Sequence, residues 1–149
     1  MRTVDVTWDQ VTESFQANGT IRGHEITINA PAAPGEKRRP TGFSAADLLL
    51  AGIGSCSAWD VVEILRKTRT EVADLAVRVT SEQDEDPPWT FRKVHLHFLF
   101  RGSAIDPAVV ERAVRLSVDK YCSVIATVRH AAEVTDSFEI VTEAAEPAA

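Results

Sequence analysis

The sequence predicts a single domain of the α+β class with antiparallel sheet. Segments with apolar residues at every second position, typical of strands, and segments with helical spacing follow the order β-β-β-α-β-β-α-α-β. Because strands come in blocks, a doubly wound parallel sheet is not expected. The 149 residues, 44% of them hydrophobic, suffice for one core. We expect one domain over residues 1–149: N-terminal strands and loop (1–43), a helix and strand body (44–142) and a frayed tail (143–149).

Charge and hydropathy exclude several classes of partner. Sixteen basic and 22 acidic residues give a net charge of −6, which offers no broad attraction for nucleic acid or anionic lipid. The longest uncharged apolar run, residues 48–59, is shorter than the eighteen or so residues of a membrane span. The first thirty residues do not resemble a signal peptide. We therefore expect a cytoplasmic protein without nucleic-acid or membrane partners.

The N-terminal third is predicted to be β structure followed by a loop. Apolar residues alternate with polar ones over residues 4–8 and again over 21–28, and the Asn18-Gly19 pair predicts a two-residue hairpin turn between strands. Residues 29–42 are rich in proline and glycine, so they are expected to form an exposed loop. This loop carries the basic cluster Lys37–Arg39.

A long helix is predicted from Ser44 to about Lys67. Ser44 is a suitable N-cap, and Asp47 three residues later completes a capping box with a shorter acid. Residues 48–50 are consecutive leucines, so the helix is apolar all round at this end and is expected to be buried. Its two glycines, at positions 52 and 54, are unfavourable within a helix and suggest the close approach of another backbone.

The C-terminal half is predicted to hold two strands, two helices and a last strand. Val94, Leu96, Phe98 and Phe100 alternate with other residues and predict a strand with one buried face. Asp106-Pro107 is a typical start for a helix, which is expected to run to about Lys120. A short helix over 124–132 and a strand over 133–142 complete the chain.

The two cysteines, Cys56 and Cys122, are either packed, inert thiols or a reactive pair. Two cysteines in a reducing compartment do not form a disulfide framework, and neither has a Cys or His at metal-ligand spacing, so no metal is expected. Cys122 is predicted at a helix N-terminus, where free amides lower a thiol pKa, so we expect it to be partly ionised near neutral pH. Cys56 lies inside its helix and needs a cation, for which the loop cluster Lys37–Arg39 is the candidate.

The segments "GFSAADLLLAGIGSC" and "SVDKYCSV" resemble the osmotically inducible protein C / organic hydroperoxide resistance (OsmC/Ohr) family, most closely its OsmC-like branch of small bacterial proteins. The likeness covers nearly the whole chain. It implies the OsmC-like α+β fold, with antiparallel sheets wrapped around two central helices in an intertwined homodimer. Two active sites are then expected at the subunit interface.

The resemblance also implies a peroxidase mechanism. Cys56 would attack the O–O bond of an organic hydroperoxide to give a sulfenic acid, and Cys122 would resolve it as a disulfide. A dithiol such as a dihydrolipoyl group would reduce that disulfide, and neither metal nor organic cofactor is needed. The catalytic arginine of the family falls on Arg39 or Arg38, with Arg22 as an alternative.

One departure from the family pattern opens a second hypothesis. Peroxidatic members carry Pro-Glu at the start of the central helix, whereas this chain has Ala45-Ala46 and an acid only at Asp47. Asp47 is then either a site residue or only a helix cap. A binding module for an apolar small molecule without turnover, and a stress-associated dimer with inert cysteines, remain alternatives. His95 and His97 share one strand face, for which a solvated or interface role is preferred over metal binding.

Overall fold

The computed structural model describes residues 2–11, 14–19, 24–29 and 42–142, and the element order is the predicted one. The chain forms two compact units, Met1–Leu49 and Leu50–Ala149. The elements are β1 (Val4–Asp9), β2 (Ser14–Gly19), β3 (His24–Ile28), α1 (Ala45–Lys67), β4 (Asp74–Gln83), β5 (Phe91–Arg101), α2 (Pro107–Leu116), the π-helical turn η1 (Ser117–Tyr121), α3 (Ser123–Val128) and β6 (Glu133–Val141). The mixed α+β class is confirmed.

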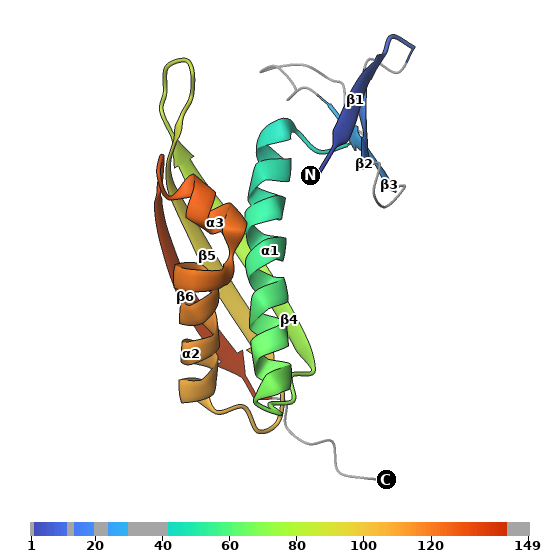
Figure 1. The fold of residues 1–149 in the computed structure, drawn as a ribbon. Helices are drawn as coiled ribbons and strands as arrows, with labels where there is room; N and C mark the ends of the chain where they lie inside the picture. Colours follow the sequence, from blue (N-terminus) through green and yellow to red (C-terminus); the bar gives the residue numbers. More distant parts are fainter. Residues whose placement is uncertain (1, 12–13, 20–23, 30–41, 143–149) are drawn as a thin grey trace. The chain divides into compact units, whose positions relative to one another are not determined.

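The N-terminal unit contains a three-stranded antiparallel meander, β1-β2-β3 (Figure 1). The prediction of a two-residue turn at Asn18-Gly19 is wrong, because both residues are the last paired positions of β2, opposite Glu25 and His24. The Asn18 side chain donates a hydrogen bond to Glu25 Oε1 at 3.0 Å, which favours this register. The connection between β2 and β3, residues 20–23, lies outside the described residues.

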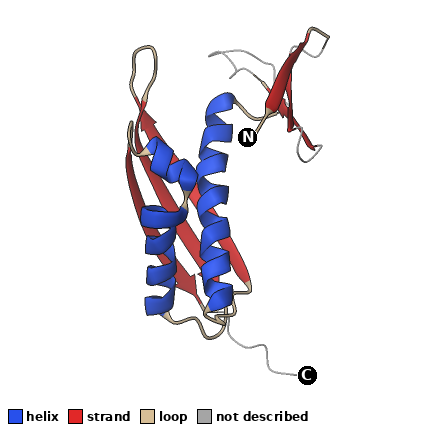
Figure 2. Cartoon of the chain, viewed as in Figure 1, coloured by secondary structure: helices blue, strands red, loops and turns tan. Residues whose placement is uncertain are grey.

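The C-terminal unit is a three-stranded sheet, β4-β5-β6, with the helices on one face (Figures 1 and 2). β5 supplies the predicted buried face: Val94, Leu96, Phe98 and Phe100 are at most 1% exposed. β4 and β5 are antiparallel, but β5 and β6 are parallel, so the expectation of purely antiparallel sheet is wrong for this pair. The reason is the connection through α2, η1 and α3, since parallel neighbours require such a crossover.

The predicted capping box at the start of α1 is confirmed. The Asp47 amide donates to Ser44 Oγ at 3.1 Å, and the Ser44 amide donates to Asp47 Oδ2 at 3.0 Å. These bonds satisfy two backbone donors that a helix start otherwise leaves unpaired. They also lower the pKa of the exposed Asp47 carboxyl, because the Ser44 hydroxyl and amide stabilise its charge.

Within the single chain α1 buries one face only, contrary to the expectation of a helix buried all round. Its buried residues lie on one side of the helix, at spacings of one to four positions: Ile53, Gly54, Ser57, Val61 and Leu65. Leu49 is 37% and Trp59 67% exposed. By length and composition α1 is able to cross a membrane, with a mean hydropathy of 1.6 over eighteen residues. Because its buried face packs in the core of an α+β fold, we interpret α1 as the core helix of a soluble protein.

Candidate active site

The structure brings Cys56 and Cys122 together although they are far apart in the sequence. Cys56 lies in the middle of α1, and Cys122 is the N-cap of α3, directly after η1. Their Sγ atoms lie within 4.8 Å of each other, and both thiols are free. The sulfurs are therefore neighbours that a small movement would bring to disulfide distance, about 2 Å.

Two buried serines hold the segments that carry the cysteines. Ser57 of α1 and Ser117 of η1 are both 0% exposed, and their hydroxyl oxygens are 2.8 Å apart in a hydrogen bond. Ser117 Oγ also donates to the backbone carbonyl of Ser57 at 3.1 Å. The Cys122 amide donates to the Ser117 carbonyl at 2.9 Å, closing the wide π-helical turn immediately before the thiol. Such turns often occur at functional sites.

The two thiols differ in burial and in acidity. Cys56 is partly exposed, whereas Cys122 is 2% exposed. The pKa of Cys122 is raised to about 11. Burial is the main cause, and the hydrogen bond and charge of Cys56 contribute to the same shift. The expectation that Cys122 is partly ionised near neutral pH is therefore wrong. The Ile125 amide does donate to Cys122 Sγ at 3.4 Å, as an N-cap predicts, but the loss of water outweighs this bond.

Asp60 is a member of the site that sequence reasoning missed. One of its carboxylate oxygens lies within 4.8 Å of both sulfur atoms. Ser117 Oγ donates to Asp60 Oδ2 at 3.5 Å, but burial dominates and raises the pKa of Asp60. A signal was available, since residues four apart on a helix share a face, and Asp60 follows Cys56 by four positions.

Thiol sulfurs and carboxylate oxygens are also atom types that bind metal ions. Binding would require both thiols to be deprotonated. Burial opposes that step for Cys122, whose pKa is raised to about 11. The burial of Cys122 therefore opposes metal binding at this cluster.

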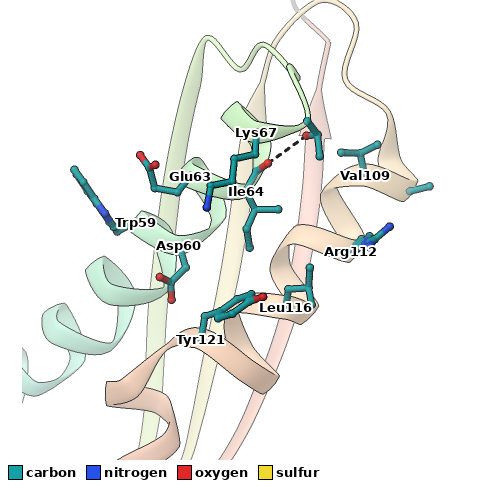
Figure 3. A pocket seen from close by; sticks show the side chains of 11 residues that line it. Trp59, Asp60, Glu63, Ile64, Lys67, Val109, Arg112, Leu116 and Tyr121 are labelled. Atoms are coloured by element: carbon teal, nitrogen blue, oxygen red, sulfur yellow. Dashed lines mark hydrogen bonds between the residues drawn. The ribbon is translucent and has the colours of Figure 1, made fainter.

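An open groove of about 880 Å³ has Asp60, a member of the thiol cluster, in its wall. Asp60 belongs both to the groove wall and to the thiol cluster, whereas Cys56 and Cys122 are not among the residues that line the groove. Figure 3 shows Asp60 and Tyr121 at the same end of the groove, and Lys67 and Val109 further along it. The wall combines apolar and charged side chains: Trp59, Asp60, Glu63, Ile64, Lys67, Thr68, Ala108, Val109, Arg112, Leu116 and Tyr121. Its volume suits a small organic ligand.

The remaining predicted site residues are the loop arginines and Asp47. Arg38 and Arg39, with the alternative Arg22, lie outside the described residues. Asp47 is engaged in the cap of α1 with Ser44, in the N-terminal unit.

The strand histidines make hydrogen bonds to the neighbouring strand. His95 Nδ1 is 2.8 Å from Thr135 Oγ1, and His97 Nδ1 is 2.9 Å from Ser137 Oγ. His95 Nε2 is also 2.8 Å from Ser137 Oγ. These contacts join β5 to β6 on the sheet face opposite the buried side chains of β5, which gives the histidines a structural role.

Fold and site together define a small α+β protein with a pair of adjacent free thiols beside Asp60. The chain belongs to the OsmC/Ohr family: the model of the OsmC-like protein family matches residues 34–136. It is 40% identical to Protein YhfA of Escherichia coli (strain K12) over 119 residues, which are 80% of this chain and 84% of that protein.

Solved structures show the same fold. A hypothetical protein from Aquifex aeolicus VF5 superposes with a TM-score of 0.81 at 30% identity, covering 97% of this chain and 98% of that one. The organic hydroperoxide resistance protein OhrB of Bacillus subtilis gives a TM-score of 0.65 at 16% identity, covering 93% and 98%. The OsmC-like fold that the sequence motifs imply is thereby confirmed.

Proposed function

We propose that the protein is a thiol-dependent peroxidase that reduces organic hydroperoxides. The observation that carries the proposal is the pair of free sulfurs within 4.8 Å, one partly exposed and one buried. The partly exposed Cys56 suits attack on a substrate, whereas the buried Cys122 suits a resolving thiol. The raised pKa of Cys122, about 11, supports the same assignment, because only a thiolate attacks a peroxide readily.

The proposed reaction has three balanced steps. The Cys56 thiolate attacks the O–O bond of the hydroperoxide, which breaks as an S–O bond forms, and the alkoxide takes up a proton to leave as an alcohol. The Cys122 sulfur then attacks the Cys56 sulfenic acid, so that a disulfide forms and water leaves. A dithiol of the dihydrolipoyl type reduces the disulfide and is itself oxidised to a disulfide. Neither metal nor organic cofactor takes part.

The groove supports an apolar hydroperoxide as substrate. Its wall includes Ile64, Val109 and Leu116, together with Asp60, which also belongs to the thiol cluster. Apolar side chains in the wall contact the organic group of such a hydroperoxide, and its binding displaces water from the groove. The activating cation in this proposal is Arg39 or Arg38.

The assembly we propose is a cytoplasmic homodimer, as the family resemblance implies. Apolar side chains exposed in the single chain support it, among them Trp59 at 67% and Tyr121 at 52%. Both flank the groove, so a partner subunit there would complete its wall. Scattered exposed apolar residues are ordinary, but two large aromatic side chains beside one groove favour an interface.

A turnover assay tests the function. Cumene hydroperoxide with dihydrolipoamide as reductant should be consumed by the wild type, and Cys56→Ser should abolish consumption. Cys122→Ser is the matched control: it should still form one sulfenic acid per chain, trapped by dimedone, but should not turn over with the dithiol. Wild-type protein that forms neither sulfenic acid nor disulfide with the peroxide would refute the proposal.

A second candidate function is the binding of an apolar small molecule without turnover. The observation that favours it is Ala46 at the start of α1, where peroxidatic relatives are expected to carry a glutamate. This function predicts a shift in melting temperature with an apolar ligand, equal in wild type and Cys56→Ser, together with no peroxide consumption.

A further inference from the structure

The Asp60 carboxylate lies beside both sulfurs and has no role in the peroxide step proposed above. One of its oxygens is within 4.8 Å of the Cys56 and Cys122 Sγ atoms. Its hydrogen bond from Ser117 is long, 3.5 Å, and the same hydroxyl lies closer to Ser57 O and Ser57 Oγ, at 3.1 and 2.8 Å. The single Ser117 hydroxyl proton is shared between Ser57 O and Asp60 Oδ2, so Ser117 leaves Asp60 with acceptor capacity.

The disulfide step needs a proton acceptor close to Cys122. Cys122 is buried and its pKa is raised to about 11, mainly by that burial, so the Cys122 thiolate is scarce at pH 7. The thiolate and not the thiol attacks sulfur. A buried thiol that must act as a nucleophile at neutral pH therefore requires a base within reach.

We propose that Asp60 is the base that accepts the Cys122 proton while the Cys122 sulfur attacks Cys56. This deepens the proposed function and rests on it. The S–H bond of Cys122 breaks with its proton passing to the Asp60 carboxylate, and the S–S bond forms as the S–O bond of the Cys56 sulfenic acid breaks. The departing hydroxide takes the proton from Asp60 and leaves as water, so the carboxylate is regenerated.

The position of Asp60 fits this role. Proton transfer needs a heavy-atom distance near 3 Å or one bridging water, and a turn of the Asp60 side chain or one water spans the present separation. Burial raises the pKa of Asp60, which makes its carboxylate a stronger base. The other charged or titratable groups on the groove wall are Glu63 and Lys67 of α1, Arg112 of α2 and Tyr121 of η1.

If Asp60 acted only as a fixed negative charge and accepted no proton, its removal would have the opposite effect on the rate of the disulfide step. A carboxylate near Cys122 disfavours the thiolate, so its removal would lower the pKa of Cys122 and speed the disulfide step. Asp60→Asn therefore separates the two roles by the sign of the rate change. Asn is close in shape to Asp and lacks a charge that burial disfavours, so the variant should fold with at least wild-type stability at pH 7.

The experiment uses reduced protein and 4,4′-dithiodipyridine, a neutral disulfide that replaces the peroxide as oxidant. Cys56 forms a mixed disulfide and releases one thiopyridone; Cys122 then attacks that disulfide and releases the second. The leaving group departs as pyridine-4-thiolate, which takes its proton from solvent at the ring nitrogen and not at the sulfur, so the second release reports removal of the Cys122 proton. Cys122→Ser should release one equivalent only. Glu111→Gln is the matched control, because Glu111 is an exposed carboxylate on α2 that lies outside both the groove wall and the thiol cluster.

For Asp60→Asn we expect the second release to slow at least tenfold at pH 7, with the first release within about threefold of wild type. Its rate should then rise tenfold per pH unit toward pH 10, whereas the wild-type profile should be shallow, and Asp60→Glu should recover part of the rate. A second release as fast as or faster than wild type, with the same pH profile, would overturn the role of Asp60. Since no peroxide is used, that result is distinct from failure of the peroxidase proposal, which the cumene hydroperoxide assay decides.

Discussion

The hydroxyl groups of Ser57 and Ser117 meet at 2.8 Å in the core and join the helix that carries Cys56 to the turn that precedes Cys122. Each serine is linked to one cysteine. Ser57 directly follows Cys56 in the sequence, and the Ser117 carbonyl accepts a hydrogen bond from the Cys122 amide. The relative position of the two thiols therefore depends on a polar contact in an otherwise apolar core.

Removal of the Ser117 hydroxyl should destabilise the fold. Ser117→Ala leaves the buried Ser57 hydroxyl without its partner, at an expected cost of about 1–3 kcal/mol in the free energy of unfolding. The double variant Ser57→Ala/Ser117→Ala should cost less than the sum of the single changes, since no orphaned hydroxyl remains. Urea denaturation measures all three. Ser55→Ala, on the exposed side of α1, is the control and should change stability little; additive single effects would contradict the pairing.

Stability should fall in alkaline solution because of Cys122. Its pKa is raised from 9.0 to about 11, so the folded state holds the Cys122 proton more tightly than the unfolded chain does. The associated stability is fully present below about pH 9 and is lost as the pH rises through about 11, on the order of 2–3 kcal/mol in all.

The measurement is the free energy of unfolding from pH 7.5 to 11, compared between wild type and Cys122→Ala so that other titrating groups cancel. The wild type should lose its advantage over this range. Cys56→Ser should retain the larger part of the decline, which is due to burial, and lose the part due to the Cys56 charge. Parallel curves for wild type and Cys122→Ala would show that the Cys122 thiol ionises as easily in the fold as in the unfolded chain.

Two glycines on α1 should respond in opposite directions to the same change. A Cβ added at Gly54 would lie 2.8 Å from Cγ2 of Val79 on β4, a stiff side chain, so Gly54→Ala should cost about 1–3 kcal/mol. A Cβ at Gly52 meets no described atom within 4 Å, so Gly52→Ala should stabilise by about 0.5–1 kcal/mol through helix propensity. Thermal unfolding of the pair measures both signs. Equal effects would show that α1 does not pack against β4 at this point.

Variants in the N-terminal cap of α1 test whether Asp47 stabilises the helix or takes part in catalysis. Ser44→Ala should lower stability by about 1 kcal/mol, and Asp47→Asn should also lower it at neutral pH. The pKa of Asp47 is lowered, so its contribution is present above the ordinary Asp range and is lost as the pH falls through the lowered value. Both variants should keep wild-type peroxide consumption per folded chain. A loss of turnover in Asp47→Asn without loss in Ser44→Ala would instead place Asp47 in the active site.

Local patterns in the sequence determined the elements of this protein. Periodicity predicted the order of strands and helices, the alternating buried face of β5 and the extent of α1 from its cap at Ser44 to Lys67. These features depend on neighbours one to four residues away, so the information lies within each segment. The two cysteine motifs likewise indicated the family, because each motif is contiguous.

The tertiary structure alone decided how the segments face one another. The parallel pairing of β5 and β6 depends on a crossover of some thirty residues, and the true register of β2 depends on β3, so neither is visible in a local pattern. The pKa of Cys122 differs from the sequence-based prediction for a related reason. The helix start that stabilises a thiolate is a local feature, whereas the burial that raises the pKa comes from the packed core. The approach of Cys122 to Cys56 and Asp60 likewise arises only when α1 and η1 pack together, through side chains from distant parts of the chain.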